Sequence, residues 1–153
     1  MDGFSLDSVK LQDYQPNRYP FLMIDFVDLV VPGVSAKGFK NLTSNEWFFP
    51  KHFPSAPNMP GALQLEALAQ MLTVAVTTLP GLKGSVVHGL KHTVRFKREV
   101  KPGDKLVLDT KINSFKRGII NGVGTASVNN EIACQASLMI SIPEEFKKFI
   151  PKK

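Results

Sequence analysis

Residues 61–79 read GALQLEALAQMLTVAVTTL, and this stretch decides the fold class. Its alanine, leucine, glutamine, glutamate and methionine residues favour a helix that starts at Pro60 and Gly61 and ends near Thr77. Apolar side chains occupy almost every side of this helix, whereas a helix on a protein surface has a single apolar stripe. We therefore expect the whole helix to be buried, most simply by a sheet that encloses it.

Extended segments flank the predicted helix on both sides. Before it, residues 20–31 and 34–43 are rich in β-branched and aromatic residues around a Pro-Gly turn, which predicts a hairpin. After it, four more segments separated by turn-like sequences predict strands: 85–100, 105–115, 118–128 and 132–142. Such strands form an antiparallel sheet, and one buried helix against it predicts an α+β fold in a single domain over residues 1–153. The first ten residues and those after Pro143 are expected to fray.

Composition and charge exclude several classes of protein. The most apolar segment, residues 62–79, is interrupted by Gln64, Glu66 and Gln70 and is shorter than the roughly 20 apolar residues that span a bilayer, so no membrane insertion is expected. The net charge of +6 favours an acidic partner, but the basic residues are spread along the chain without a nucleic-acid-binding module, so no nucleic acid is expected. The N-terminus does not read as a secretory signal, and Cys134, expected in a strand and buried, is the only cysteine. A cytoplasmic protein is predicted.

Three residues around the start of the helix are candidates for chemistry. His52 lies within residues 44–60, where four prolines predict a stiff, irregular loop. Gly61 would place a backbone N–H at the positive end of the helix dipole, where it stabilises a developing oxyanion. Glu66 lies roughly 7.5 Å further along the helix axis, and a carboxyl group among apolar side chains favours its neutral, proton-donating form. A base, an acid and an oxyanion donor suit removal of a proton α to a carbonyl with loss of a β-hydroxyl, which requires no metal or redox cofactor.

Each of these residues also has an ordinary structural interpretation. Taken alone, His52 is more often a hydrogen-bonded loop residue, Gly61 a turn residue and Glu66 a surface residue of a helix. His88 and His92 lie in a predicted strand without the spacing of metal ligands, so we expect structural or surface roles for them and no metal site. Composition and spacing by themselves leave the function open.

The three candidates occur together inside one longer motif. HFPSAPNMPGALQLEALAQ, at 52–70, closely resembles the signature of the hot-dog-fold 3-hydroxyacyl-acyl carrier protein dehydratases of type II fatty-acid synthesis. Three further segments resemble the same family: NRYPFLMID at 17–25, NEWFFPKHFP at 45–54 and VRFKREVKPGDKL at 94–106. The resemblance covers roughly residues 16–142. It implies an antiparallel sheet wrapped around a long central helix, and dehydration of 3-hydroxyacyl thioesters to trans-2-enoyl thioesters in fatty-acid or related lipid synthesis.

The resemblance also implies a role for each candidate. The histidine aligned with His52 is the catalytic base, the carboxylate aligned with Glu66 assists the departing hydroxyl, and the glycine aligned with Gly61 offers its amide to the thioester carbonyl. The family's active site is shared across a homodimer, with the histidine from one subunit and the acid from the other, and trimers of dimers are common. The implied partner is acyl carrier protein, and no cofactor is implied.

Neighbouring residues are expected to have supporting roles. Within the motif, Phe53, Met59 and Pro60 are predicted to contact the substrate. Four basic residues further along the chain are candidates for contact with the acidic carrier protein, with a plain solvated edge as an equal alternative. They are Arg95, Lys97, Arg98 and Lys101.

The chain departs from the family pattern at four positions. Asn17 stands where histidine is common, Phe26 where arginine is frequent, and Lys51 and Ser55 where glycine is usual. None of these changes removes a group from the implied mechanism, but they leave acyl-chain preference and the choice between general and specialised pathways open.

The same fold could also carry other functions. Glutamate at position 66 resembles the branch that dehydrates without moving the double bond, and a bifunctional dehydratase and isomerase is the first alternative. The others are a thioesterase and a non-catalytic module that binds acyl groups or the carrier protein.

Overall fold

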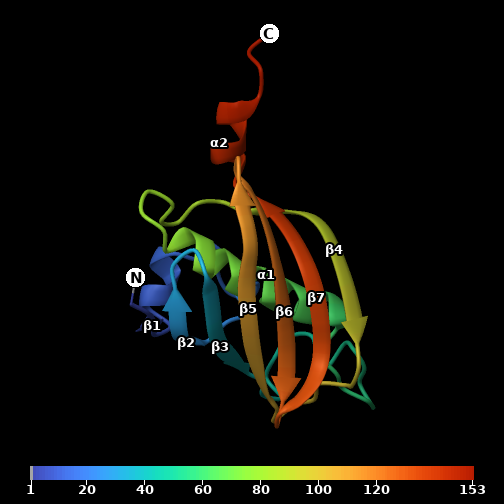
Figure 1. The fold of residues 1–153 in the computed structure, drawn as a ribbon. Coiled ribbons are helices and arrows are strands. Elements are labelled where there is room, and N and C mark those ends of the chain that lie inside the picture. Colours follow the sequence, from blue (N-terminus) through green and yellow to red (C-terminus); the bar gives the residue numbers. More distant parts are fainter. Residues whose placement is uncertain (1) are drawn as a thin grey trace.

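Helix α1 spans Gly61–Thr77 and lies against the inner face of a curved sheet, as Figure 1 shows. The structure is a computed structural model that describes residues 2–153. Every residue of α1 from Ala67 to Thr77 is buried except the half-buried Ala69. The predicted bounds of the helix are confirmed, and its burial is confirmed beyond the first turns. No helix in the described part of the chain has the length and hydropathy needed to cross a membrane.

Within residues 2–153, seven strands form one antiparallel sheet in the order β1-β2-β3-β5-β6-β7-β4. Their bounds are β1 Phe4–Leu6, β2 Phe26–Val31, β3 Ser35–Asn41, β4 His88–Phe96, β5 Lys105–Lys116, β6 Ile119–Val128 and β7 Glu131–Ser141. The α+β fold, the hairpin of β2 and β3, and the four strands after α1 are confirmed. β4 follows α1 directly in the chain but lies at the edge of the sheet beside β7.

The expectation that the first ten residues of the chain fray is wrong. β1 pairs with β2, and the short 3-10 helix η1 (Lys10–Asp13) places Leu11 in the core. Leu6 and Leu11 are both buried, so these first residues gain apolar contacts that offset the cost of ordering them. At the other end, α2 (Pro143–Phe146) and the 3-10 helix η2 (Lys147–Phe149) form, but neither contains a buried residue, so fraying of this end stays a prediction.

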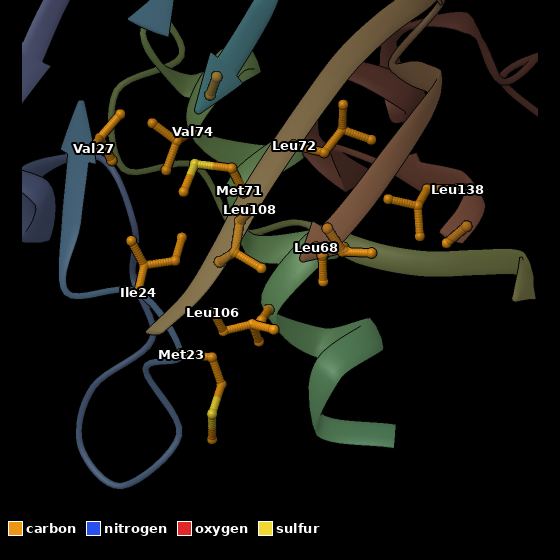
Figure 2. Close-up of a cluster of buried hydrophobic side chains, with 14 of the residues drawn as sticks. Met23, Ile24, Val27, Leu68, Met71, Leu72, Val74, Leu106, Leu108 and Leu138 are labelled. Atoms are coloured by element: carbon orange, nitrogen blue, oxygen red, sulfur yellow. The ribbon is translucent and has the colours of Figure 1, made fainter. Parts of the chain in front are cut away.

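The hydrophobic core lies between α1 and the sheet (Figure 2). Leu68, Met71 and Leu72 of α1 are fully buried, as are Leu106 and Leu108 of β5. Strand β6 presents two glycines to the helix. A Cβ atom at Gly122 would lie 2.7 Å from Leu72 Cδ1, and one at Gly124 would lie 3.1 Å from Leu68 Cδ2. The absence of a side chain at these positions lets α1 approach the sheet closely.

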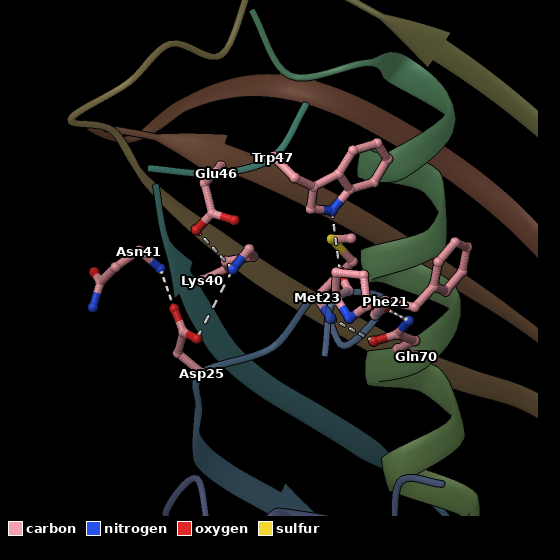
Figure 3. Close-up of polar contacts among 9 residues, drawn as sticks. Phe21, Met23, Asp25, Lys40, Asn41, Glu46, Trp47 and Gln70 are labelled. Atoms are coloured by element: carbon pink, nitrogen blue, oxygen red, sulfur yellow. Dashed lines mark hydrogen bonds and ion pairs between the residues drawn. The ribbon is translucent and has the colours of Figure 1, made fainter. Parts of the chain in front are cut away.

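A buried ion pair attaches the loop that follows β3 (Figure 3). Lys40 is 6% exposed, and its Nζ atom lies 3.2 Å from Glu46 Oε1 and 4.0 Å from Asp25 Oδ1. The indole N–H of Trp47 donates a 3.2 Å hydrogen bond to the Pro20 carbonyl. These contacts hold the start of the predicted irregular loop, which carries no helix or strand from 42 to 60.

Candidate active site

His52 lies in this loop, and its ring is oriented by a backbone carbonyl. The Nδ1 atom is 3.0 Å from the Asn58 carbonyl oxygen, while the Asn58 N–H donates a 2.9 Å hydrogen bond to the His52 carbonyl. The Met59 N–H then bonds the Val100 carbonyl at 2.7 Å, which ties the loop to the chain beyond β4. Because a carbonyl oxygen only accepts, Nδ1 carries the proton and Nε2 keeps a free lone pair. His52 therefore has the tautomer that a general base requires.

Gly61 begins α1 without a cap. Pro60 precedes it and offers no side-chain hydrogen bond, and the first turn holds no acidic residue. Among residues 2–153 the Gly61 N–H has no acceptor, so it points its partial positive charge at whatever lies beyond the helix end. Packing also requires a residue without a side chain at position 61, which the sequence does not reveal. A Cβ atom there would lie 2.6 Å from the ring of Phe96 in β4.

Glu66 is half-buried in the single chain, which is less than its apolar sequence neighbours led us to expect. Its Oε1 atom accepts a 3.0 Å hydrogen bond from Gln70 Nε2. Gln70 is only 2% exposed, and both atoms of its amide are bonded to the N-terminal segment (Figure 3). Its Nε2 also donates to the Phe21 carbonyl at 2.8 Å, and its Oε1 accepts from the Met23 N–H at 2.8 Å. Gln70 thus fixes one oxygen of the Glu66 carboxyl.

Gln70 is a functional candidate that the sequence analysis missed. The available signal was a glutamine in an otherwise apolar turn, four residues after Glu66 on the same face of a helix.

The substrate-contact candidates lie in different environments. The Phe53 ring is exposed and stacks on the His52 ring, with 4.3 Å between centroids. Met59 is buried in the core, and Pro60 is half-buried at the helix start.

The candidates line two separate cavities in one chain. Gly61 and Met59 border a cavity of about 560 Å³, together with Asn58, Ala62, Gln64, Phe96, Arg98 and Glu99. Glu66 borders a second cavity of about 80 Å³ that also contains Gln70 and His92. His52 lines neither of them. Within the part of the chain that the structure describes, no group of three or more histidine, cysteine, aspartate or glutamate side chains is placed to hold a metal ion.

The four basic candidates near the end of β4 do not form one free cationic patch. Arg98 Nη1 lies 2.9 Å from Glu131 Oε2, and Lys101 Nζ lies 3.6 Å from Glu99 Oε2. Arg95 and Lys97 are exposed, and Arg95 borders a hollow on the outer face of the sheet. Two of the four charges are therefore already paired within the chain.

Comparison with known proteins gives one consistent result. A model of the FabA-like domain matches residues 15–137. A 3-hydroxyacyl-[acyl-carrier-protein] dehydratase, FabZ of Thermoanaerobacter pseudethanolicus, is 42% identical over 143 residues, which are 92% of this chain and 99% of the relative. FabZ of Bacillus subtilis is 41% identical over 141 residues, 91% of this chain and 99% of its own length.

Solved structures agree on the fold. The dehydratase heterocomplex ApeI:P of Xenorhabdus doucetiae superposes with a TM-score of 0.76 at 17% identity, over 93% of this chain and 97% of that one. A putative thioesterase of Ralstonia eutropha superposes with a TM-score of 0.56 at 17% identity, over 71% of this chain and 76% of that one. The predicted hot-dog fold, a sheet wrapped around a central helix, is confirmed. With a family match over most of its length and relatives above 40% identity, the chain belongs to the FabA-like family.

Proposed function

We propose that the chain is a hydro-lyase that dehydrates 3-hydroxyacyl groups carried as thioesters on acyl carrier protein. Relatives that carry this name match it over more than nine-tenths of its length. The observation that carries the mechanism is the hydrogen bond from His52 to the Asn58 carbonyl, because it leaves Nε2 free to accept a proton. A carrier-bound substrate and a single, buried cysteine also suit a cytoplasmic location.

The proposed reaction uses one group at each reacting atom. His52 Nε2 takes the proton from the carbon α to the thioester, and the negative charge passes to the carbonyl oxygen. The Gly61 N–H stabilises that oxygen. Glu66 donates a proton to the 3-hydroxyl group, which leaves as water while the α–β double bond forms. The product is a trans-2-enoyl thioester, and the proton gained by His52 balances the one lost by Glu66.

The active site is proposed to lie between two copies of the chain. In the single chain, His52 lines neither the cavity of Glu66 nor that of Gly61. β4 is an edge strand and leaves one side of its backbone without a partner in the sheet. Exposed apolar side chains lie on it, with Leu90 53% and Phe96 48% exposed. Proteins rarely leave such an edge open, because it pairs readily with another strand. We therefore place the β4 strand of a second copy there, so that His52 of one chain meets Glu66 of the other.

Direct assay tests this proposal. The purified protein is incubated with 3-hydroxyacyl carrier-protein thioesters of several chain lengths, and the products are identified by chromatography and mass spectrometry. We expect trans-2-enoyl thioesters only. A cis-3-enoyl product would instead identify a dehydratase and isomerase, and release of free thiol would identify a thioesterase.

Substitutions test the assignment of residues. His52→Ala and Glu66→Gln should each lower turnover by at least about a thousand-fold, since each removes a proton-transfer group. Glu144→Gln, which changes an exposed glutamate far along the chain from the proposed site and outside β4, serves as a matched control and should retain activity. Near-full dehydration by both active-site variants would show that the assignment is wrong.

A further inference from the structure

The small cavity beside Glu66 holds a second ionisable side chain. Its volume is about 80 Å³, and its walls come from the N-terminal segment, α1, β4 with the residue before it, and β7. The residues that matter here are Asn17, Glu66, Gln70, Thr73, Gly89 and His92. The proposed reaction assigns no role to His92, for which the sequence predicted a structural or surface position.

Most polar groups around this cavity already have partners. Gln70 uses both atoms of its amide, and Thr73 Oγ1 donates to the Ala69 carbonyl at 2.9 Å. Within residues 2–153, three side chains on the walls have groups without a hydrogen bond: Glu66 at Oε2, Asn17 at its amide and His92 at both ring nitrogens. These side chains come from three different segments and line one cavity.

The two ring nitrogens of His92 lie in different surroundings. Nδ1 is shielded from solvent and has no partner among the described residues. Nε2 lies over Gly89, which borders the cavity, and a Cβ atom on that glycine would be only 2.7 Å away. A buried lone pair without a partner is less costly than a buried N–H without one. The favoured tautomer therefore has its lone pair at Nδ1 and its proton at Nε2, which makes Nε2 a donor beside the cavity.

We propose that His92 is a positioning residue for Glu66 and acts through water held in this cavity. The Nε2–H of His92 donates to a water molecule, and that water donates to Glu66 Oε2, the oxygen that Gln70 leaves free. The volume exceeds the roughly 10–15 Å³ that one water centre needs, and polar walls on several sides supply the two to four partners that a buried water requires. Glu66 is then held at both oxygens. The inference rests on the proposed function of Glu66 as the acid.

Three substitutions of His92 separate its two nitrogens. His92→Gln keeps an amide N–H near the place of Nε2, His92→Asn keeps a polar atom only near Nδ1, and His92→Leu keeps neither. We expect the Gln variant to stay within about three-fold of wild-type kcat. The Asn and Leu variants should lose roughly 10- to 100-fold in kcat with little change in KM, as for one hydrogen bond to an ionisable group. Circular dichroism, thermal unfolding and oligomer mass show whether each variant folds.

A variant that leaves every polar group in place provides an independent test. Gly89→Ala puts a methyl group against Nε2 and pushes the ring away, so it should lower kcat about as much as His92→Leu. Combining Gly89→Ala with His92→Leu should cause little further loss, because both act on one interaction.

Two results would overturn the inference. One is wild-type kcat in the Leu variant, and the other is rescue by Asn but not by Gln, which would assign a structural role to Nδ1. If Glu66→Gln is inactive while His92→Leu is fully active, only this inference fails. A wild-type protein that dehydrates none of the thioesters would refute the proposed function itself.

Discussion

At the scale of single residues, the side-chain amide of Gln70 makes three hydrogen bonds that join Glu66 to the N-terminal segment. Gln70→Leu would leave the buried Met23 N–H without an acceptor and the Phe21 carbonyl without its donor. We expect the free energy of unfolding to fall by about 2 kcal/mol, and kcat to fall because the carboxyl group is no longer held.

Denaturant unfolding and steady-state kinetics measure both effects. Gln12→Leu, at an exposed glutamine in η1, is the matched control and should change stability by less than about 0.5 kcal/mol. Equal effects of the two substitutions would mean that Gln70 is not the anchor described here.

Cys134 provides a prediction about pH at the same scale. Its thiol is fully buried in β7, as the sequence predicted, and burial raises its pKa to about 11 from an ordinary value of 9.0. The unfolded chain loses this proton more readily, so the contribution to stability is complete below about pH 9 and is lost as the pH rises toward and through 11. The free energy of unfolding should therefore fall over this range.

Comparison with Cys134→Ala separates this contribution from the titration of lysines. The free energy of unfolding of the variant should fall less steeply between pH 9 and 11. Identical slopes for the two proteins would contradict the assignment. At neutral pH the native thiol should also resist alkylation, whereas one thiol per chain reacts in denaturant.

At the scale of elements, the approach of α1 to β6 depends on Gly122. A methyl group there would lie 2.7 Å from Leu72 and 2.8 Å from the Lys111 carbonyl, and the backbone of β5 cannot move aside easily. We expect Gly122→Ala to lower the free energy of unfolding by about 1–3 kcal/mol. Gly124→Ala, whose nearest contacts are 3.1 Å away and belong to side-chain ends, should cost less. Thermal or denaturant unfolding of the two variants tests this order, and a larger loss of stability in Gly124→Ala would refute the proposed helix packing.

Elements with long, regular sequence patterns could be predicted, whereas short ones could not. Helix α1 and strands β5 to β7 carry long, regular patterns, and their predicted bounds lie within a residue or two of the observed ones. β1 has only three residues, and it exists because tertiary packing buries Leu6 and the nearby Leu11. Such short elements leave no periodic signal.

The candidate site likewise has residues that the sequence predicts and residues that only tertiary packing reveals. His52, Gly61 and Glu66 stand out in one motif, whereas the roles of Gln70 and His92 depend on contacts between residues far apart in the chain. The Gln70 amide reaches Met23, and His92 borders a cavity with Asn17. Sequence spacing does not reveal such contacts.

At the scale of the whole molecule, the open edge at β4 predicts a dimer. The chain mass is 16.9 kDa, so light scattering after size-exclusion chromatography should give about twice this value. Dilution that separates the subunits should abolish dehydration, because each proposed site takes His52 and Glu66 from different chains. An active monomer would contradict this arrangement.

Complementation between two inactive proteins tests the shared site most directly. His52→Ala and Glu66→Gln homodimers are mixed and allowed to exchange subunits, and native mass spectrometry of tagged chains counts the heterodimers. Each heterodimer would contain one site with both mutations and one with none. At random exchange, half of the dimers are mixed, so activity should recover to about a quarter of the wild-type value. Heterodimers that form in the expected amount without any recovery of activity would show that His52 and Glu66 do not act together across two chains.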